Sequence, residues 1–297
     1  MIEAYILHLL IFICIYAILA MSLNLITGYA GMLNLGHAAF FGIGAYASVL
    51  IVMAGFPFWI GFIAAGAIAA FFGLLLSIPA LRLRGDFLAI ATLAFGEIIR
   101  SILVNWTELT RGPLGIPGIP KPEIFGIVFD SMWMYFILAF IITAIAYLVL
   151  RHLLNSDFGI ALKAIRENES VAASLGKNVN LLKMQAFAVG AFFAGLAGSL
   201  FAHYITFIDP GTFVLGETIL ILLMVALGGM GSLEGSVLGA IILILLPEPL
   251  RFIGLPSAVV GPLRQIIYAA ILIVLVIKRP KGLLGTQWFG GIVSDSD

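Results

Sequence analysis

Few residues of this chain have the types and spacing that enzyme chemistry needs. His8, His152 and His203 are isolated, because no H-E-x-x-H motif occurs and nothing near them has metal-ligand spacing. Ser232, in the sequence GMGS, could form a dyad with His203, but no third group that would orient the histidine is evident. An enzyme built on these two residues is therefore the least favoured function. We expect the chain to have no catalytic residue and no bound metal or cofactor.

The sequence also lacks the loop that cradles the phosphates of ATP in many nucleotide-binding proteins. The motif G-x-x-x-x-G-K-[S/T] does not occur, and Gly176-Lys177-Asn178 fails at its last position and has no upstream glycine. If ATP drives the activity of this chain, another chain must therefore bind and hydrolyse it.

Glu97 and Arg100 form the clearest charged pair within an otherwise apolar run. They are three residues apart and share a helix face, so an internal ion pair is the first interpretation and contact with a substrate the alternative. Glu97 is also the only clear carboxylate inside such a run, because Glu217 and Glu234 fall near predicted helix ends. An ion-coupled transporter acting alone is therefore less favoured, since proton relays usually need more carboxylates.

Asn24, Asn34 and His37 flank a GYAG sequence that begins at Gly28 and favours a break between helices. Helix ends at such a break would aim free N–H and C=O groups into a cavity, where an amino acid zwitterion could bind. Equally, Asn24 and Asn34 could simply cap helices beside Gly28 and Gly36. With both interpretations open, the three polar residues are candidates for a translocation path, together with the charged pair above.

The composition indicates that these residues belong to a protein embedded in lipid. The chain has 297 residues, of which 62% are hydrophobic and 10% charged, and its mean hydropathy is +1.18. A soluble domain would have about a quarter of its residues charged. Most of this surface therefore cannot face water, and a lipid bilayer is its expected partner. Basic and acidic side chains are equal in number, 15 each, which gives no indication of nucleic acid binding.

Apolar runs of about 20 residues are long enough to cross a bilayer, and they predict an all-α, polytopic transmembrane helix bundle. We expect the whole chain, 1–297, to form a single transmembrane domain with about eight or nine spans. The segments 215–231 and 234–250 are short and could be half-helices that enter the membrane and return. The expected spans lie near 4–27, 31–54, 57–79, 87–104, 132–150, 186–207, 215–231, 234–250 and 262–278.

Basic residues predict the orientation of these spans. They gather in a short loop at Arg82 and Arg84, in the longer loop 151–185, and in a tail that begins at Lys278. The positive-inside rule puts all three segments in the cytoplasm. The N-terminus and the loop 105–131, whose prolines and glycines make it irregular, are then expected outside.

The loop 151–185 is too polar to span a membrane but has the pattern of short helices. Ser156 offers N-cap chemistry, and Gly176 suits a helix C′ position, where a positive φ carries no Cβ penalty. We expect one or two cytoplasmic helices with a face of small residues, Ala172, Ala173 and Gly176. A helix lying on the membrane would need large apolar residues on that face, so docking of another protein is favoured.

Small residues recur at a spacing that favours close packing of helices. Glycine or alanine every four residues lets two helices approach closely. In addition, the sequences Gly28-x-x-Gly31 and Gly228-x-x-Gly231 hint at an internal repeat, and paired broken segments usually point to a central pathway. The rows of small residues are Gly61, Ala65, Ala69 and Gly73 in one span and Gly190, Ala194 and Gly198 in another.

Three segments are distinctive in their residues and in their order along the chain: GYAGMLNLGHAAFFGIGAYAS (28–48), DFGIALKAIRENESVAASLGKN (157–178) and GGMGSLEGSVLGA (228–240). In these segments the chain resembles branched-chain amino acid permeases of the LivM type, within the LivH/LivM family. It implies a membrane-spanning permease subunit of an ATP-binding cassette importer, which moves leucine, isoleucine and valine across the inner (plasma) membrane. It also implies two separate ATP-binding subunits, a second homologous permease and an extracytoplasmic substrate-binding protein. A related subfamily that carries urea or other small amides leaves a second substrate class open.

The charged loop is similar to the EAA-type coupling loop of such importers, which docks into a groove on the ATPase subunit. The chain departs from the general pattern by having Ser170 and Val171 before the two alanines. By position, the resemblance implies a docking core of Glu169, Ala172, Ala173 and Gly176, with Arg166 and Glu167 as polar contacts.

Overall fold

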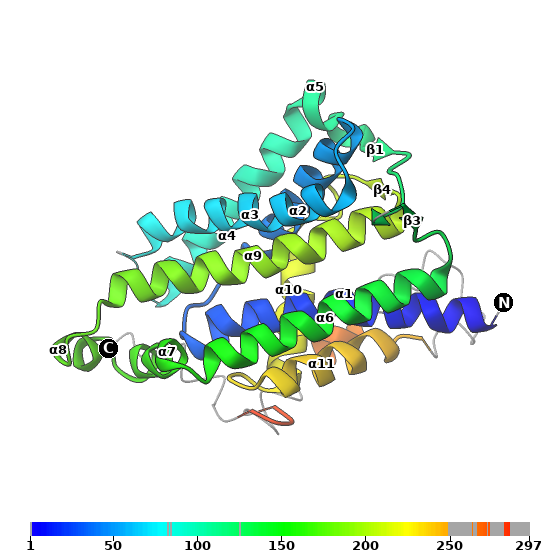
Figure 1. Ribbon diagram of the computed structural model, residues 1–297. Coiled ribbons are helices and arrows are strands. Elements are labelled where there is room, and N and C mark those ends of the chain that lie inside the picture. Colours follow the sequence, from blue (N-terminus) through cyan, green and yellow to red (C-terminus); the bar gives the residue numbers. More distant parts are fainter. Residues whose placement is uncertain are drawn as a thin grey trace.

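The computed structural model describes residues 2–81, 83, 85–124, 126–248, 263, 266–271, 273 and 282–285. Within these residues the chain forms a bundle of helices (Figure 1), which confirms the expected all-α class. Three apolar helices are short, namely α2 (His37–Met53), α10 (Leu215–Gly228) and α11 (Leu233–Leu245). The long helices are α1 (Ile2–Asn24), α3 (Phe58–Ala80), α4 (Gly85–Asn105), α6 (Met132–Leu154) and α9 (Val179–Ile205).

In the described part of the chain, five helices are long and apolar enough to cross a membrane: α1, α3, α4, α6 and α9. The pair α10 and α11 is bent by 119° at its break and adds a sixth if counted as one span. The expected count of eight or nine is approximate, because it included α2 as a full span, counted α10 and α11 separately, and included 262–278, part of which lies outside the described residues. The 17 residues of α2 reach only about 25 Å, against a hydrocarbon thickness of about 30 Å.

Some of the expected features lie outside the described residues. This is the case for Arg82, Arg84 and Lys278 and for most of the predicted span 262–278.

Helix α9 forms the centre of the bundle and packs against α1, α2 and α3 (Figure 1). A Cβ atom on Gly198 would lie 2.1 Å from the carbonyl oxygen of Phe41 in α2, and one on Gly195 would lie 2.5 Å from that of Ala65 in α3. Backbones this close leave room only for hydrogen. The predicted role of the small-residue rows in helix packing is therefore confirmed.

Large apolar side chains cover the outward faces of α3, α4 and α6. Phe71, Phe87 and Leu148 are each more than 60% exposed. Exposed apolar surface of this extent is unusual for a monomeric soluble protein, and it suits contact with lipid.

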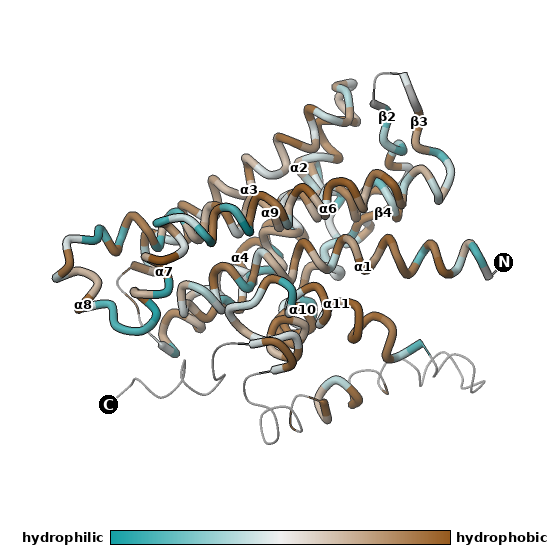
Figure 2. The backbone as a smooth tube through the Cα atoms, turned by 60° about the horizontal axis from the view of Figure 1, so that its bottom comes forward, coloured by the Kyte–Doolittle hydropathy of each residue, from teal (hydrophilic) through white to brown (hydrophobic). Residues whose placement is uncertain are grey.

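The polar segments lie at opposite ends of the bundle. One end has the two short helices α7 (Asp157–Glu167) and α8 (Glu169–Ser174) (Figure 1). The other end has the N-terminus and the loop 105–131, as the predicted orientation requires. Hydrophilic residues accordingly gather at α7 and α8 and near β2, while the helices between them are mostly apolar (Figure 2).

The loop 105–131 is largely irregular, as expected from its prolines and glycines. Its elements are short: helix α5 (Thr107–Thr110), a 3-10 turn η2 (Gly112–Leu114), and strands β1 (Ile116–Pro117), β2 (Glu123–Ile124) and β3 (Ile127–Val128). Strand β2 pairs with β3, and β1 pairs antiparallel with β4 (Phe207–Ile208), with Ile116 opposite Ile208. The β1–β4 pair ties the loop to the end of α9.

Candidate functional site

Asn24 joins the two breaks that the glycine motifs predicted. α1 ends at Asn24 and continues as a π-helical turn, η1 (Leu25–Tyr29). The fully buried Asn24 side chain accepts a hydrogen bond from Gly231 N–H (2.9 Å), and its amide donates to Ser232 O and Ser236 Oγ, both at 2.7 Å. It therefore acts as a bridge between the first and second broken segments, rather than as a cap of its own helix.

The short helices α2 and α10 both begin inside the bundle, beside the second half of α1. His37, the first residue of α2, is hydrogen bonded through Nε2 to Ser22 Oγ at 2.8 Å, and Glu217 in the first turn of α10 accepts a hydrogen bond from Tyr16. The two helices also touch each other, because Ala38 N–H donates to Thr218 Oγ1 at 3.0 Å. Two helix N-termini, which carry the positive ends of the helix dipoles, thus meet inside the bundle.

Asn34 stabilises the turn that leads into α2 but does not cap the helix, whose N-cap is Gly36 without a side-chain cap. Its Oδ1 accepts a hydrogen bond from Gly36 N–H at 3.0 Å, just before α2 begins. Its amide lies 3.4 Å from Nδ1 of His37, which is also fully buried. In the described conformation both side chains hold the extended segment before α2 in place and do not face an open cavity.

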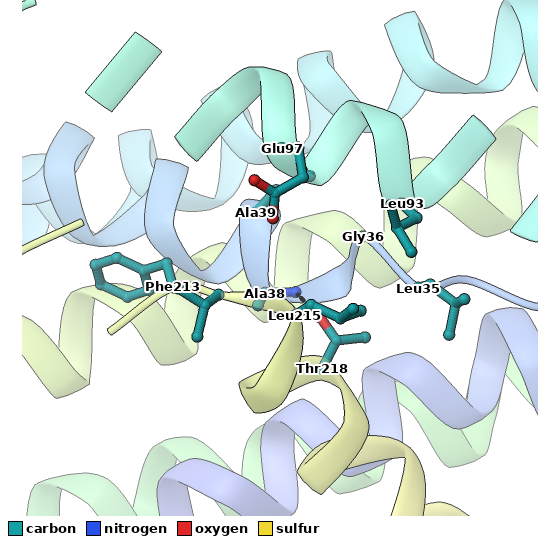
Figure 3. A pocket seen from close by; sticks show the side chains of 11 residues that line it. Leu35, Gly36, Ala38, Ala39, Leu93, Glu97, Phe213, Leu215 and Thr218 are labelled. Atoms are coloured by element: carbon teal, nitrogen blue, oxygen red, sulfur yellow. Dashed lines mark hydrogen bonds between the residues drawn. The ribbon is translucent and has the colours of Figure 1, made fainter. Parts of the chain in front are cut away.

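A small pocket lies where α2, α4 and α10 meet. The space at its centre is about 10 Å³, which is roughly the room that one water molecule needs. Figure 3 shows Glu97 of α4 pointing towards Ala39 and the beginning of α2. The lining is otherwise mostly apolar and consists of Leu35, Gly36, Ala38, Ala39, Leu93, Gly96, Glu97, Phe213, Val214, Leu215 and Thr218.

Glu97 and Arg100 form the ion pair that their spacing predicted, with Nε and Oε2 2.8 Å apart. The two side chains are 46% and 41% exposed, respectively. Glu97 lies eight residues before the end of α4 at Asn105, or about 12 Å along the helix axis. A half-exposed ion pair at this depth is costly against lipid, so this face of α4 is suited to a protein neighbour or an aqueous path.

Thr92, Thr218 and the Tyr16–Glu217 pair belong to this site but were not identified from the sequence. Thr92 Oγ1 accepts a hydrogen bond from Leu35 N–H at 2.9 Å. Glu217 was assigned to a helix end, which is correct, but that end lies inside the bundle next to Tyr16. The short length of the 215–231 run was the only signal in the sequence that pointed to a helix beginning inside the membrane.

The contacts of Ser232 and His203 contradict a catalytic dyad. Ser232 caps α11, where its Oγ accepts a hydrogen bond from Gly235 N–H at 3.0 Å. His203 is bonded instead to Ser48 Oγ at 3.1 Å and to the carbonyl oxygen of Pro120 at 2.7 Å. The histidine is thus held at the end of α9 near the loop 105–131, whereas the serine lies at the break near Asn24.

The loop 151–185 contains two short helices, α7 and α8, where one or two were expected. Asn168 separates α7 from α8 and caps α8 by accepting a hydrogen bond from Val171 N–H at 3.0 Å. Gly176 has a φ of 80°, as its predicted C′ position requires. Gly176 N–H bonds to Ala173 O and Lys177 N–H to Ala172 O, which is the Schellman pattern at the end of a helix.

The implied docking residues are divided between the surface and the interior. Ala172 is 1% exposed and packs against Ile165 and Val179, so the small-residue face predicted at the surface is correct only in part. Glu169 pairs with the buried Lys183 of α9 at 2.9 Å, and Arg166 donates a hydrogen bond to the carbonyl oxygen of Gly28. The residues left exposed on α8 and its C-terminal cap, here called the α8 surface, are Ser170, Val171, Ala173, Ser174, Leu175 and Gly176.

Comparisons with known proteins agree with this architecture. A family model described as "branched-chain amino acid transport system / permease component" matches residues 5–276. The chain is 38% identical to the high-affinity branched-chain amino acid transport system permease protein LivM of Escherichia coli, over 91% of this chain and 68% of that protein. It is 26% identical to a probable LivM of Methanocaldococcus jannaschii (93% and 92% covered) and 28% identical to LivH of Escherichia coli (91% and 91% covered). No solved structure gives a significant match.

Proposed function

Because the chain belongs to the branched-chain amino acid transport permease family, we propose that it is the inner-membrane permease subunit of an ATP-binding cassette importer for leucine, isoleucine and valine. The observation that carries this proposal is the match to LivM over nine-tenths of the chain, together with a family model whose matched residues, 5–276, include both breaks and the loop 151–185. The bent pair α10 and α11 and the short helix α2 support it, since broken helices are typical of transport pathways.

The pocket between α2, α4 and α10 is the proposed position at which the substrate passes. The N-termini of α2 and α10 would favour the carboxylate of an amino acid, and Glu97 would attract its ammonium group. The leucine and valine side chains around the pocket would contact an aliphatic side chain. With room for about one water in this conformation, the pocket must widen for transport, which fits alternating access.

The outward face of α4 is proposed to contact a second, homologous permease. The half-exposed Glu97–Arg100 pair would then lie at an interface between two permeases rather than against lipid. The chain is similar to both LivM and LivH relatives, so a pair of related but different permeases is the proposed arrangement. The loop 105–131, at the opposite end from α8 (Figure 1), would meet an extracytoplasmic substrate-binding protein.

The α8 surface is proposed as the docking site for one of two ATP-binding subunits, which would hold the ATP that this chain lacks the motif to bind. Val171 and Leu175 are 53% and 74% exposed on a helix that projects from the end of the bundle. Apolar side chains at such a position suit a groove on a partner protein. The two positions replace Ala172 as the proposed centre of the contact.

Docking is tested by co-purification of the ATP-binding subunits with tagged permease. Leu175→Asp should remove most of the bound ATPase, because it puts a charge into an apolar contact. Leu114→Asp is the matched control, since Leu114 is 82% exposed at the opposite end of the molecule. Equal recovery of the ATPase with both variants would refute docking at α8.

Substrate class is tested with the complete complex in proteoliposomes. Uptake of labelled leucine should be inhibited by excess isoleucine and valine but not by urea. Inhibition by urea alone would favour the amide-transporting alternative.

A further inference from the structure

Arg166 lies away from the α8 surface and reaches back to the break in α1. Its guanidinium Nη1 donates a hydrogen bond to the carbonyl oxygen of Gly28, and its side chain is only 11% exposed although it belongs to a polar loop. We propose that Arg166 is a positioning residue that transmits movement of the loop to the broken end of α1, and that it does not contact the ATPase. This inference rests on the proposed function, which supplies the subunits that move the loop.

Gly28 offers a favourable acceptor for this arginine. The carbonyl groups at the end of a helix have no partners within the helix, and they carry the negative end of its dipole. A guanidinium group is a strong, charge-assisted donor to such an oxygen. The neighbouring Gly31 makes room for the contact, because a Cβ atom there would lie 2.6 Å from Cγ of Arg166.

A second cation of α7 contacts the same turn. Nζ of Lys163 lies 5.6 Å from the centre of the Tyr29 ring, within the range of a cation–π interaction. Lys163 and Arg166 are three residues apart and therefore lie on one face of α7. This face is thus fixed to consecutive parts of η1, a π-helical turn of the kind often found at functional sites.

From η1 the contacts continue to the second break. A Cβ atom on Gly28 would lie 2.6 Å from the backbone nitrogen of Gly231, so the two breaks touch directly. Asn24 adds its three hydrogen bonds to Gly231, Ser232 and Ser236. A rotation of α7 that pulls on Gly28 would therefore displace α10 and α11 as well as the end of α1.

The exposure of the loop residues fits separate roles for the α8 surface, which would dock the ATPase, and for Arg166, which would not. Glu167, next to Arg166, is 64% exposed and lies 3.2 Å from the guanidinium, so the arginine is screened from a partner on that side. Nε of Arg166 is buried and has no hydrogen-bond partner among the described residues. A second position of the Arg166 side chain, in which Nε also has an acceptor, would be favoured for this donor. The contact with Gly28 can therefore belong to one of two states of the loop.

The test compares Arg166→Gln with wild type in the complete complex with its ATP-binding subunits. Three quantities are measured: the amount of co-purified ATPase, the rate of ATP hydrolysis, and the leucine taken up per ATP. Lys177→Gln is the matched control, because it removes the same charge from an exposed position of the same loop. Gly31→Ala is a second variant, which keeps Arg166 but obstructs its side chain.

We expect ATPase recovery and hydrolysis within about twofold of wild type for Arg166→Gln, and leucine uptake per ATP lowered roughly tenfold, as for the loss of a hydrogen bond to a charged group. Gly31→Ala should lower leucine uptake per ATP in the same way, and Lys177→Gln should leave it unchanged. Loss of bound ATPase from Arg166→Gln would overturn the inference and make the residue a docking contact. Unchanged uptake per ATP, or failure of both variants to assemble, would also overturn it. A wild-type complex that takes up no leucine would instead refute the proposed function.

Discussion

Replacing Asn24 by alanine should destabilise the protein more than replacing Asn34, the other buried asparagine of the site. The variant loses three hydrogen bonds across the two breaks. One of them ends on Ser232 O, which has other partners, and one on the Ser236 hydroxyl, which can rotate. The loss of each costs about 0.6 kcal/mol, the average for hydrogen bonds between membrane helices. The third leaves the partly buried Gly231 N–H without an acceptor, which costs about 1–3 kcal/mol. The expected loss in free energy of unfolding is therefore about 2–4 kcal/mol.

The assay is reversible unfolding in mixed micelles of dodecylmaltoside and SDS. Asn34→Ala is the matched control, because Asn34 is equally buried but makes one local hydrogen bond, to Gly36, and one long contact, to His37. By the same reasoning its expected cost is about 1–3 kcal/mol, from the Gly36 N–H left without an acceptor, or about 1 kcal/mol less than for Asn24→Ala. If Asn24→Ala costs no more than Asn34→Ala, the two breaks are not held together as described.

Two further substitutions test helix packing and the substrate site. Gly198→Ala should prevent recovery of folded protein as a single peak in size-exclusion chromatography, since its Cβ would meet the Phe41 backbone at 2.1 Å, whereas Gly216→Ala, whose nearest contact is at 3.9 Å, should be recovered normally. Equal recovery would contradict the packing of α2 on α9. Glu97→Gln should raise the KM for leucine uptake roughly tenfold or more by removing the partner of the ammonium group, while Glu108→Gln in the outer loop should leave the KM unchanged. A KM unaffected by Glu97→Gln would remove the pocket from the path.

Much of the fold could be predicted from the sequence, because each long apolar run had one interpretation. The five full-length helices, the short elements at 215–250 and the two helices of the loop follow from hydropathy, capping residues and Gly176. The depth of α2 could not be predicted in this way. Its sequence is as apolar as that of a span. The segment between Gly31 and Gly36 is held by a local hydrogen bond from Gly36 N–H to Asn34 and by one from Leu35 N–H to Thr92 of α4, a contact that no local pattern encodes.

The site was harder to predict than the fold. Glu97 and Arg100 were paired correctly from their spacing, since both lie on one helix. The bridge from Asn24 to Gly231 and the contact from Arg166 to Gly28 join residues more than a hundred positions apart, and no local pattern encodes them. Ala172 shows the limit of a small-residue pattern, because close packing against α7 and α9 and close contact with a partner protein favour the same residue type.

Uptake of labelled leucine into proteoliposomes tests the central claim most directly, when the chain alone is compared with the complete complex containing the ATP-binding subunits, the second permease and the binding protein. The account predicts that leucine accumulates only in the complete complex and only with ATP. Accumulation by the chain alone under an imposed ion gradient would contradict it.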